Sequence, residues 1–364
     1  MASTNSAVAL ISYVARFLNI GIDPTGPSHL HAIQPLSHLE RTPLMSRRRP
    51  ANIDANILKQ PARFGFTIAA CLLFICLSSK PLCADESDIE LLAESRIAVV
   101  GDSITQAGHY VSFLSYQLQK SYPNRTFDVY PLGLSSETVS GLSEDGHAGG
   151  RFPRPCLFER FDRLLSKVKP DVLIACYGMN DGIYQPLEAS RFAAFQNGIQ
   201  NMIAQAQQAG VKKIYLVTPP IYDYQPTDGS FNYESVLSEY ARWETKLKLP
   251  NVKVIDLHTA MRDARMKRDQ PFSNDKVHPN EEGHWLMAQT IASALGASKT
   301  SMTLAKAKAD PVFASIDAIR NLRWKAWMNH IGYTREKTYP PQPLGGSEAL
   351  VAEQQEAIKK LIAR

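Results

Sequence analysis

The chain has 364 residues, enough for one large domain or two small ones, and its apolar fraction of 44% is ordinary for a globular protein. Its 40 Lys and Arg outnumber its 35 Asp and Glu, but residues 1–84 hold eight of the former and three of the latter, which leaves 32 of each. The rest of the chain is therefore formally neutral, and its overall charge gives no support for a nucleic acid partner.

Residues 1–84 are predicted to be a disordered leader that ends in a signal peptide. Five basic residues precede an apolar run over 64–77, and Leu82-Cys83-Ala84 offers a cleavage site. A membrane span takes about 20 apolar residues, so this shorter run fits a signal peptide better. We expect an exported protein, periplasmic or secreted, and an uncleaved membrane anchor at 64–77 is the alternative. Met45 is a second candidate for the translational start.

Cysteine usage predicts neither a disulfide framework nor a metal site. Three of the five cysteines fall in the leader, which leaves Cys156 and Cys176. Cys176 lies in an apolar run, where a free thiol is usually a small buried hydrophobe. No Cys and His cluster has the spacing of metal ligands.

From residue 96 onward, short apolar runs alternate with amphipathic stretches, which is typical of βαβ units around a buried parallel sheet. The predicted strands are Ile97–Val100, Phe127–Tyr130, Val172–Tyr177, Ile214–Val217 and Val252–Ile255. The predicted helices cover about 109–121, 157–168, 188–209, 231–247 and 281–296. This pattern predicts one three-layer α/β domain over residues 95–297, with about five parallel strands.

Two segments depart from this alternation. Ser135–Pro155 is rich in Gly, Ser and Pro, and a long ordered loop in a compact domain is usually functional. Residues 298–364 contain two amphipathic stretches, at about 311–331 and 347–363, and are predicted to form a helical C-terminal extension. This extension either packs on the domain or mediates oligomerisation, and the sequence does not choose between them.

The motif Gly101-Asp102-Ser103 follows the first predicted strand. In open α/β sheets the reactive groups gather beyond the carboxyl ends of the strands. Gly101 allows a tight turn, and the N-terminus of a following helix favours developing negative charge, which makes Ser103 a candidate nucleophile. The alternative is that Asp102 and Ser103 only cap that helix.

The segment Asp275-Lys276-Val277-His278 lies between the fifth strand and the last strong helix. A serine hydroxyl is a weak nucleophile until a base takes its proton. The spacing of three lets both side chains project from one turn, so that His278 acts as base while Asp275 accepts its Nδ1 hydrogen. The alternative is a helix-capping loop with a solvated histidine.

The segment Gly178-Met179-Asn180-Asp181-Gly182 follows the strand that ends at Tyr177. Asn180 can donate an amide hydrogen to an oxyanion, which preorganised donors stabilise best. The backbone N–H groups of Ser103 and Gly133 would complete such a hole. The alternative for Asn180 is a turn residue in an Asn-Asp-Gly loop.

With these motifs in this order, the chain resembles the SGNH hydrolases, also called GDSL-type esterases and lipases, over residues 95–297. The matching blocks are Gly-Asp-Ser at 101–103, the lone Gly133, Gly-x-Asn-Asp at 178–181 and Asp-x-x-His at 275–278. One departure is Pro131, where the family often has Asn two residues before the glycine.

The resemblance implies a role for each matching residue. Ser103 is expected to be the nucleophile, His278 the general base and Asp275 the carboxylate that orients it. Ser103 N–H, Gly133 N–H and the Asn180 side chain are expected to form the oxyanion hole. The resemblance also implies a flavodoxin-like α/β/α sandwich that needs no metal or organic cofactor.

The predicted reaction is hydrolysis of a carboxylic ester, either short-chain or a carbohydrate O-acetyl ester, through an acyl-enzyme on Ser103. Asp102, Arg151, Arg154 and Tyr184 are candidates for the substrate cleft, although both arginines also fit solvated surface charges. Alternatives at the same site are lipase, lysophospholipase or thioesterase activity. An alternative of another class is a catalytically silent cell-surface binding module. The predicted partner is a small-molecule or carbohydrate ester, and a membrane only if the leader is uncleaved.

Overall fold

The computed structural model describes residues 86–297 and 302–363 of the chain. The predicted leader, with its apolar run at 64–77 and Met45, lies outside the described residues. Within the described ranges, no helix combines the length and the apolar character needed to cross a bilayer.

The centre of the fold is a parallel sheet with the strand order β2-β1-β3-β4-β5. Four strands agree within one residue at each end with the apolar runs of the sequence, and β5 agrees fully. Helices cover both faces, which is why the central strands β1, β3 and β4 are rich in Val, Ile, Leu and Ala. The bounds are Arg96–Gly101 for β1, Asp128–Pro131 for β2, Val172–Cys176 for β3, Lys213–Val217 for β4 and Val252–Ile255 for β5.

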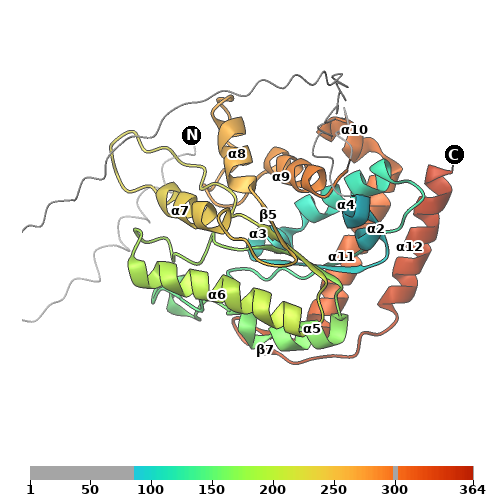
Figure 1. The fold of residues 1–364 in the computed structure, drawn as a ribbon, viewed down its shortest axis with the longest axis horizontal. Coiled ribbons are helices and arrows are strands. Elements are labelled where there is room, and N and C mark those ends of the chain that lie inside the picture. Colours follow the sequence, from blue (N-terminus) through green and yellow to red (C-terminus); the bar gives the residue numbers. More distant parts are fainter. Residues whose placement is uncertain (1–85, 298–301, 364) are drawn as a thin grey trace, which may run out of the picture. The chain divides into compact units, whose positions relative to one another are not determined.

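Helices form the two outer layers of the sandwich (Figure 1). On one face α4 packs against α9, where the rings of Phe113 and Trp285 meet edge to face at 5.2 Å, and α5 and α6 lie on the opposite face. This arrangement confirms the flavodoxin-like α/β/α architecture. The bounds are His109–Ser121 for α4, Phe161–Val168 for α5, Ala189–Gln208 for α6, Glu234–Glu244 for α7, Leu257–Arg265 for α8 and Glu281–Ala294 for α9.

The structure also contains helices that the apolar pattern did not predict. They include α2 (Glu86–Ala93), α3 (Ser103–Ala107) and α8. Each has nine residues or fewer, too short for a clear helical period, and α8 begins almost directly after β5. The predicted helix at 157–168 is divided, because Arg160 has non-helical dihedral angles between a 3₁₀ turn at Leu157–Glu159 and α5.

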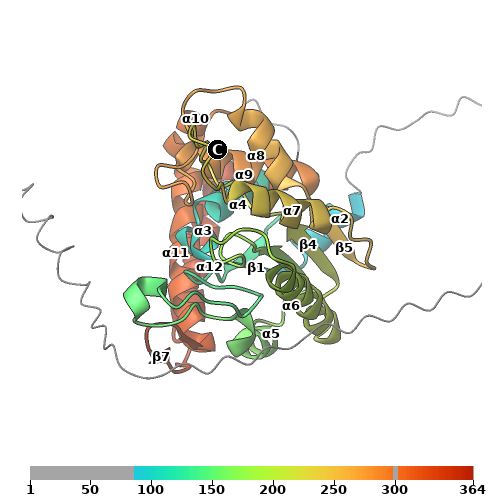
Figure 2. The same cartoon turned by 90° about the vertical axis from the view of Figure 1, so that its left-hand side faces the viewer.

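The C-terminal extension packs on the domain, which was one of its two predicted roles. It comprises α10 (Leu304–Ala309), α11 (Pro311–Ile331), a small hairpin of β6 (Tyr333–Thr334) and β7 (Thr338–Tyr339), and α12 (Ser347–Ile362). Helix α11 contacts both α4 and the edge strand β2. Figure 2 shows α11 running along one side of the domain.

Residues of α11 cover the edge of the sheet that β2 forms. Arg323 donates to the Val129 carbonyl of β2 at 3.1 Å, and the Trp327 ring meets the Tyr130 ring edge to face at 5.0 Å. Covering an edge strand in this way removes a surface that would otherwise pair with other chains. Helix α12 packs on α11.

Candidate active site

Ser103 stands at the sharp turn between β1 and α3. A Cβ atom at Gly101 would lie 2.1 Å from Thr105 Oγ1 and 2.6 Å from the Cys176 carbonyl oxygen, so only glycine fits here. Asp102 caps α3, because its Oδ1 accepts the Ile104 N–H at 2.9 Å. The capping interpretation is therefore right for Asp102, and it leaves the Ser103 hydroxyl available.

Three side chains from two distant segments meet at this turn. Ser103 Oγ lies 2.8 Å from His278 Nε2, and His278 Nδ1 lies 2.6 Å from Asp275 Oδ2. His278 and Asp275 have about half of their side-chain surfaces exposed, 49% and 57%. The hydroxyl, imidazole and carboxylate thus form one continuous chain of hydrogen bonds that is open to solvent.

A strained turn shapes the Asp275 end of this chain. Lys276 has φ of 75°, a left-handed conformation that costs a side-chain residue about 1–2 kcal/mol. The turn lets Asp275 Oδ1 accept the N–H groups of Val277 at 3.0 Å and His278 at 2.8 Å, and the Ser273 hydroxyl donates to it at 3.0 Å.

These hydrogen bonds determine the charge of the carboxylate. Burial raises the pKa of Asp275, but the hydrogen bonds from His278, from Val277 N–H and from the Ser273 hydroxyl outweigh it and hold the pKa below its ordinary value. Asp275 therefore remains a carboxylate beside His278 in mildly acidic solution.

Asn180 is held in one orientation by two donors. Its Oδ1 accepts Arg154 Nη1 at 2.9 Å and the Tyr184 hydroxyl at 3.2 Å, while its Nδ2 donates to the Glu137 carbonyl at 3.3 Å. An amide nitrogen carries two hydrogens, so one remains for a further acceptor. The backbone after Asn180 is strained, because Ile183 and Tyr184 both have left-handed φ angles, 48° and 56°.

Gly133 packs directly on the backbone of α3. A Cβ atom there would lie 2.3 Å from Gln106 N and 2.5 Å from the Thr105 carbonyl carbon, so glycine is required. Its carbonyl accepts the Trp324 indole N–H at 3.1 Å, whereas its own N–H has no acceptor in the described part of the chain. A donor without a partner beside α3 is suited to an external oxygen atom.

The predicted cleft residues divide into two groups. Arg154 and Tyr184 contact Asn180, and the Arg154 guanidinium also lies 5.3 Å from the centre of the Tyr184 ring. Asp102 is buried under α3, and Arg151 is exposed, with its Nε donating to the Ala148 carbonyl. The Asp102 side chain thus serves as a helix cap, and the Arg151 side chain is bound to a local turn.

Sequence reasoning missed the part played by Asp181. Its Oδ1 accepts the N–H groups of Val139 and Ser140, both at 2.8 Å, and its Oδ2 accepts Gly178 N–H at 3.0 Å. Asp181 thereby joins the loop after β2 to the loop after β3. The only signal in the sequence was an acidic residue next to Asn180, in a segment that also fits an ordinary turn.

Two further features concern ligands. In the described ranges, no group of three or more His, Cys, Asp or Glu side chains is arranged to hold a metal ion. A cavity of about 430 Å³ lies where α4 and β2 meet the extension helices α11 and α12. None of the predicted site residues lines this cavity.

The buried carboxylate of Asp102 should make stability depend on pH. Burial raises its pKa to about 7, the charges of Asp181 and Glu137 add to this effect, and the Ile104 N–H and His278 oppose it. The folded protein therefore keeps a proton on Asp102 that the unfolded chain releases near pH 4. This difference makes the unfolding free energy fall as pH rises from about 4 to 7, after which it no longer changes.

Asp102→Asn keeps the helix cap but cannot titrate, so it isolates this effect. In urea titrations from pH 4 to 8, the unfolding free energy of Asp102→Asn minus that of the wild type should rise by about 4 kcal/mol up to pH 7. The matched control Asp269→Asn, at an exposed position, should show no such rise. A pH-independent difference for Asp102→Asn would contradict the expectation.

The model of the GDSL-like Lipase/Acylhydrolase family matches residues 99–286. A comparison with curated proteins found no match.

Solved structures with a similar fold include a gut microbial diltiazem-metabolizing enzyme, 18% identical with a TM-score of 0.42 over 56% of this chain and 47% of that chain, so this chain spans about half of its length. Another is a member of the lipolytic protein G-D-S-L family from Veillonella parvula, 19% identical with a TM-score of 0.38 over 54% of this chain and 96% of that chain. A third is a psychrotrophic esterase from Pseudoalteromonas, 17% identical with a TM-score of 0.37 over 55% of this chain and 96% of that chain.

The family match covers more than half of the chain and contains every block of the resemblance. It extends from β1 into α9 and thus includes the segments of Ser103, Gly133, Asn180 and His278. The chain belongs to the GDSL-like lipase and acylhydrolase family.

Proposed function

We propose that this hydrolase cleaves carboxylic esters through an acyl-enzyme on Ser103. The observation that carries the proposal is the hydrogen-bonded chain from Ser103 Oγ to His278 and on to Asp275, at 2.8 and 2.6 Å. These distances lie within the range in which a base can take the proton of a nucleophile.

In the first half of the reaction, His278 Nε2 takes the Ser103 proton as Oγ bonds to the ester carbonyl carbon. The carbonyl electrons move to oxygen, and the N–H groups of Ser103 and Gly133 and the free Asn180 amide hydrogen receive the resulting negative charge. When this intermediate collapses, the alcohol leaves with the proton from His278. Asp275 stabilises the imidazolium in between.

In the second half, water attacks the acyl group on Ser103 while His278 takes one of its protons. The second intermediate collapses, the acid product leaves, and Ser103 regains its proton from His278. Atoms and charge balance without any co-reactant other than water.

For the substrate we propose a short acyl group on a polar alcohol such as a carbohydrate. Support comes from the residues around Asn180, which are charged or aromatic: Arg154, Glu144, Tyr184 and Tyr222. Aromatic rings and charged hydrogen-bonding groups suit a sugar better than a long aliphatic chain. Activity that rises steadily with acyl length would instead favour a lipase or lysophospholipase.

Covalent labelling tests the proposed function directly. The purified full-length chain should react with a fluorophosphonate probe, and peptide mapping should place the adduct on Ser103, because an activated serine attacks the electrophilic phosphorus. Heat-denatured protein serves as the control and should stay unlabelled. If the folded protein also stays unlabelled while a reference esterase reacts, the chain is a silent binding module.

Asn180→Ala should lower kcat by about 10²- to 10³-fold, because one side-chain donor to the oxyanion is lost. KM for a short-chain aryl ester should change little, since the bond forms in the transition state. The matched control is Asn201→Ala on the exposed face of α6, which should retain wild-type kcat. An unchanged kcat in folded Asn180→Ala would remove Asn180 from the oxyanion hole.

A further inference from the structure

Two donors of the proposed oxyanion hole, the Gly133 N–H and the Asn180 side chain, depend on one buried pair of charged residues. The peptide group that carries the Gly133 N–H has the Leu132 carbonyl at its other end, and this oxygen accepts Arg160 Nη2 at 2.7 Å. The Asn180 side chain donates to the backbone carbonyl of Glu137 at 3.3 Å. Arg160 thus binds the peptide group that carries one donor, and the Glu137 backbone binds the other donor.

Arg160 and Glu137 form a buried ion pair with two parallel hydrogen bonds. Arg160 Nε and Nη2 each lie 2.7 Å from one carboxylate oxygen of Glu137, and both side chains have no exposed surface. The Tyr177 hydroxyl donates to Glu137 at 2.6 Å. Burial lowers the pKa of Arg160, but the charge of Glu137 outweighs it and raises the pKa, so the guanidinium stays charged.

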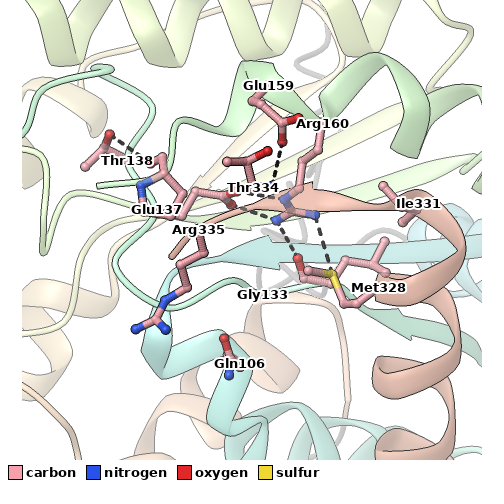
Figure 3. Close-up of polar contacts among 12 residues, drawn as sticks. Gln106, Gly133, Glu137, Thr138, Glu159, Arg160, Met328, Ile331, Thr334 and Arg335 are labelled. Carbon is pink, nitrogen blue, oxygen red and sulfur yellow. Dashed lines mark hydrogen bonds and ion pairs between the residues drawn. The ribbon is translucent and has the colours of Figure 1, made fainter. Parts of the chain in front are cut away.

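Two residues of the C-terminal extension contact Arg160 and Gly133. Figure 3 shows the guanidinium of Arg160 between Glu137 and Met328 of α11, whose sulfur atom lies 3.7 Å from Nη1. One turn earlier on α11, Trp324 donates to the Gly133 carbonyl. Residues beyond the family match at 99–286 therefore hold the same segment as the buried pair.

Stability alone does not explain a fully buried ion pair at this position. Taking two charges out of water offsets most of their attraction, and apolar residues of similar volume often replace such pairs without loss. A charged pair can do something that apolar residues cannot, namely bind two backbone carbonyl groups at fixed points. In a trans peptide the N–H points away from the C=O, so holding the Leu132 oxygen aims the Gly133 N–H. A cation on that oxygen also polarises the peptide and strengthens its N–H as a donor.

We propose that the buried Arg160–Glu137 pair positions the oxyanion hole, by aiming Gly133 N–H through the Leu132 carbonyl and Asn180 through the Glu137 carbonyl. Both are positioning residues, since neither touches the substrate. This inference rests on the proposed ester hydrolysis at Ser103. It extends that function to Arg160, which directly precedes α5, and to Glu137 in the loop after β2.

The test removes both charges together, so that no unpaired charge stays buried. Arg160→Met/Glu137→Leu in the full chain should lower kcat for a short-chain aryl ester about 10- to 100-fold, with KM within about twofold. The rate of fluorophosphonate labelling should fall in parallel, because that reaction also places negative charge on oxygen. Arg160→Gln/Glu137→Gln is the second variant if the first does not fold, and it should give a smaller loss of kcat.

Two comparisons separate positioning from a general structural effect. Arg242→Met/Glu239→Leu removes a partly exposed ion pair within α7 and should leave kcat unchanged. In an Asn180→Ala background, the Arg160/Glu137 double variant should cost clearly less than it does in the wild type, because one of its two targets is already gone.

The outcomes also distinguish this inference from the proposed function. If a folded double variant keeps wild-type kcat and labelling rate, the positioning role is wrong while the hydrolase assignment stands. Equal losses in the wild-type and Asn180→Ala backgrounds would likewise overturn the link through Asn180. A wild-type chain that neither hydrolyses esters nor reacts with the probe would instead overturn the proposed function itself.

Discussion

Replacing Ser103 with alanine is expected to lower kcat toward a short-chain aryl ester by about 10⁶-fold, the size of loss seen when a nucleophile that acts as a unit with its base is removed. The hydroxyl is the only group of the hydrogen-bonded chain that bonds to the acyl carbon in the proposed mechanism. KM should stay close to that of the wild type, because the remaining donors and the cleft are unchanged. Steady-state kinetics and loss of probe labelling measure the effect.

The matched control is Ser166→Ala on α5. Its hydroxyl is exposed and donates to the Arg163 carbonyl, so its removal should leave both kinetics and labelling unchanged. Circular dichroism should give the same spectrum for both variants and the wild type. Retention of more than about 1% of wild-type kcat by folded Ser103→Ala would mean that another residue is the nucleophile.

Asp275→Asn should lower kcat by about 10⁴-fold, because the amide cannot hold His278 in the tautomer that leaves Nε2 free to take the Ser103 proton. It also removes the negative charge that stabilises the imidazolium. The loss should persist from pH 5 to pH 9, since hydrogen bonds hold the pKa of Asp275 below its ordinary value and keep the wild-type carboxylate ionised throughout. A pH profile of kcat for both proteins measures this.

Asp269→Asn serves as control, because it makes the same chemical change at an exposed position of the preceding loop. Its kcat should match the wild type at every pH. The turn itself should survive Asp275→Asn, because an Asn side-chain oxygen still accepts the N–H groups of Val277 and His278. Nearly full activity in the variant would show that His278 needs no carboxylate partner.

The sheet could be predicted closely from the sequence, because its strands are short, mostly apolar segments bounded by turn residues. The motifs with Ser103 and Asn180 could be placed at the carboxyl ends of strands for the same reason, and the motif with His278 could be placed before the last helix of the domain. Short helices such as α8 escaped prediction because nine residues carry too little periodicity. The burial of Arg160 also escaped prediction, because a charged residue in a predicted amphipathic helix is expected on the exposed face.

The identity of the reactive groups was therefore determined locally, by which residue types follow which strands. Only the tertiary structure decided which residues hold these reactive groups in place. Leu132, Glu137 and Asn180 come from two loops, and Trp324 and Met328 come from an extension more than 100 residues away, so no sequence spacing relates them. Hydrogen bonds between loops depend on how the layers pack against the sheet. That packing turns Asp102 inward as a buried cap and sets the Arg160–Glu137 pair behind the Gly133 peptide.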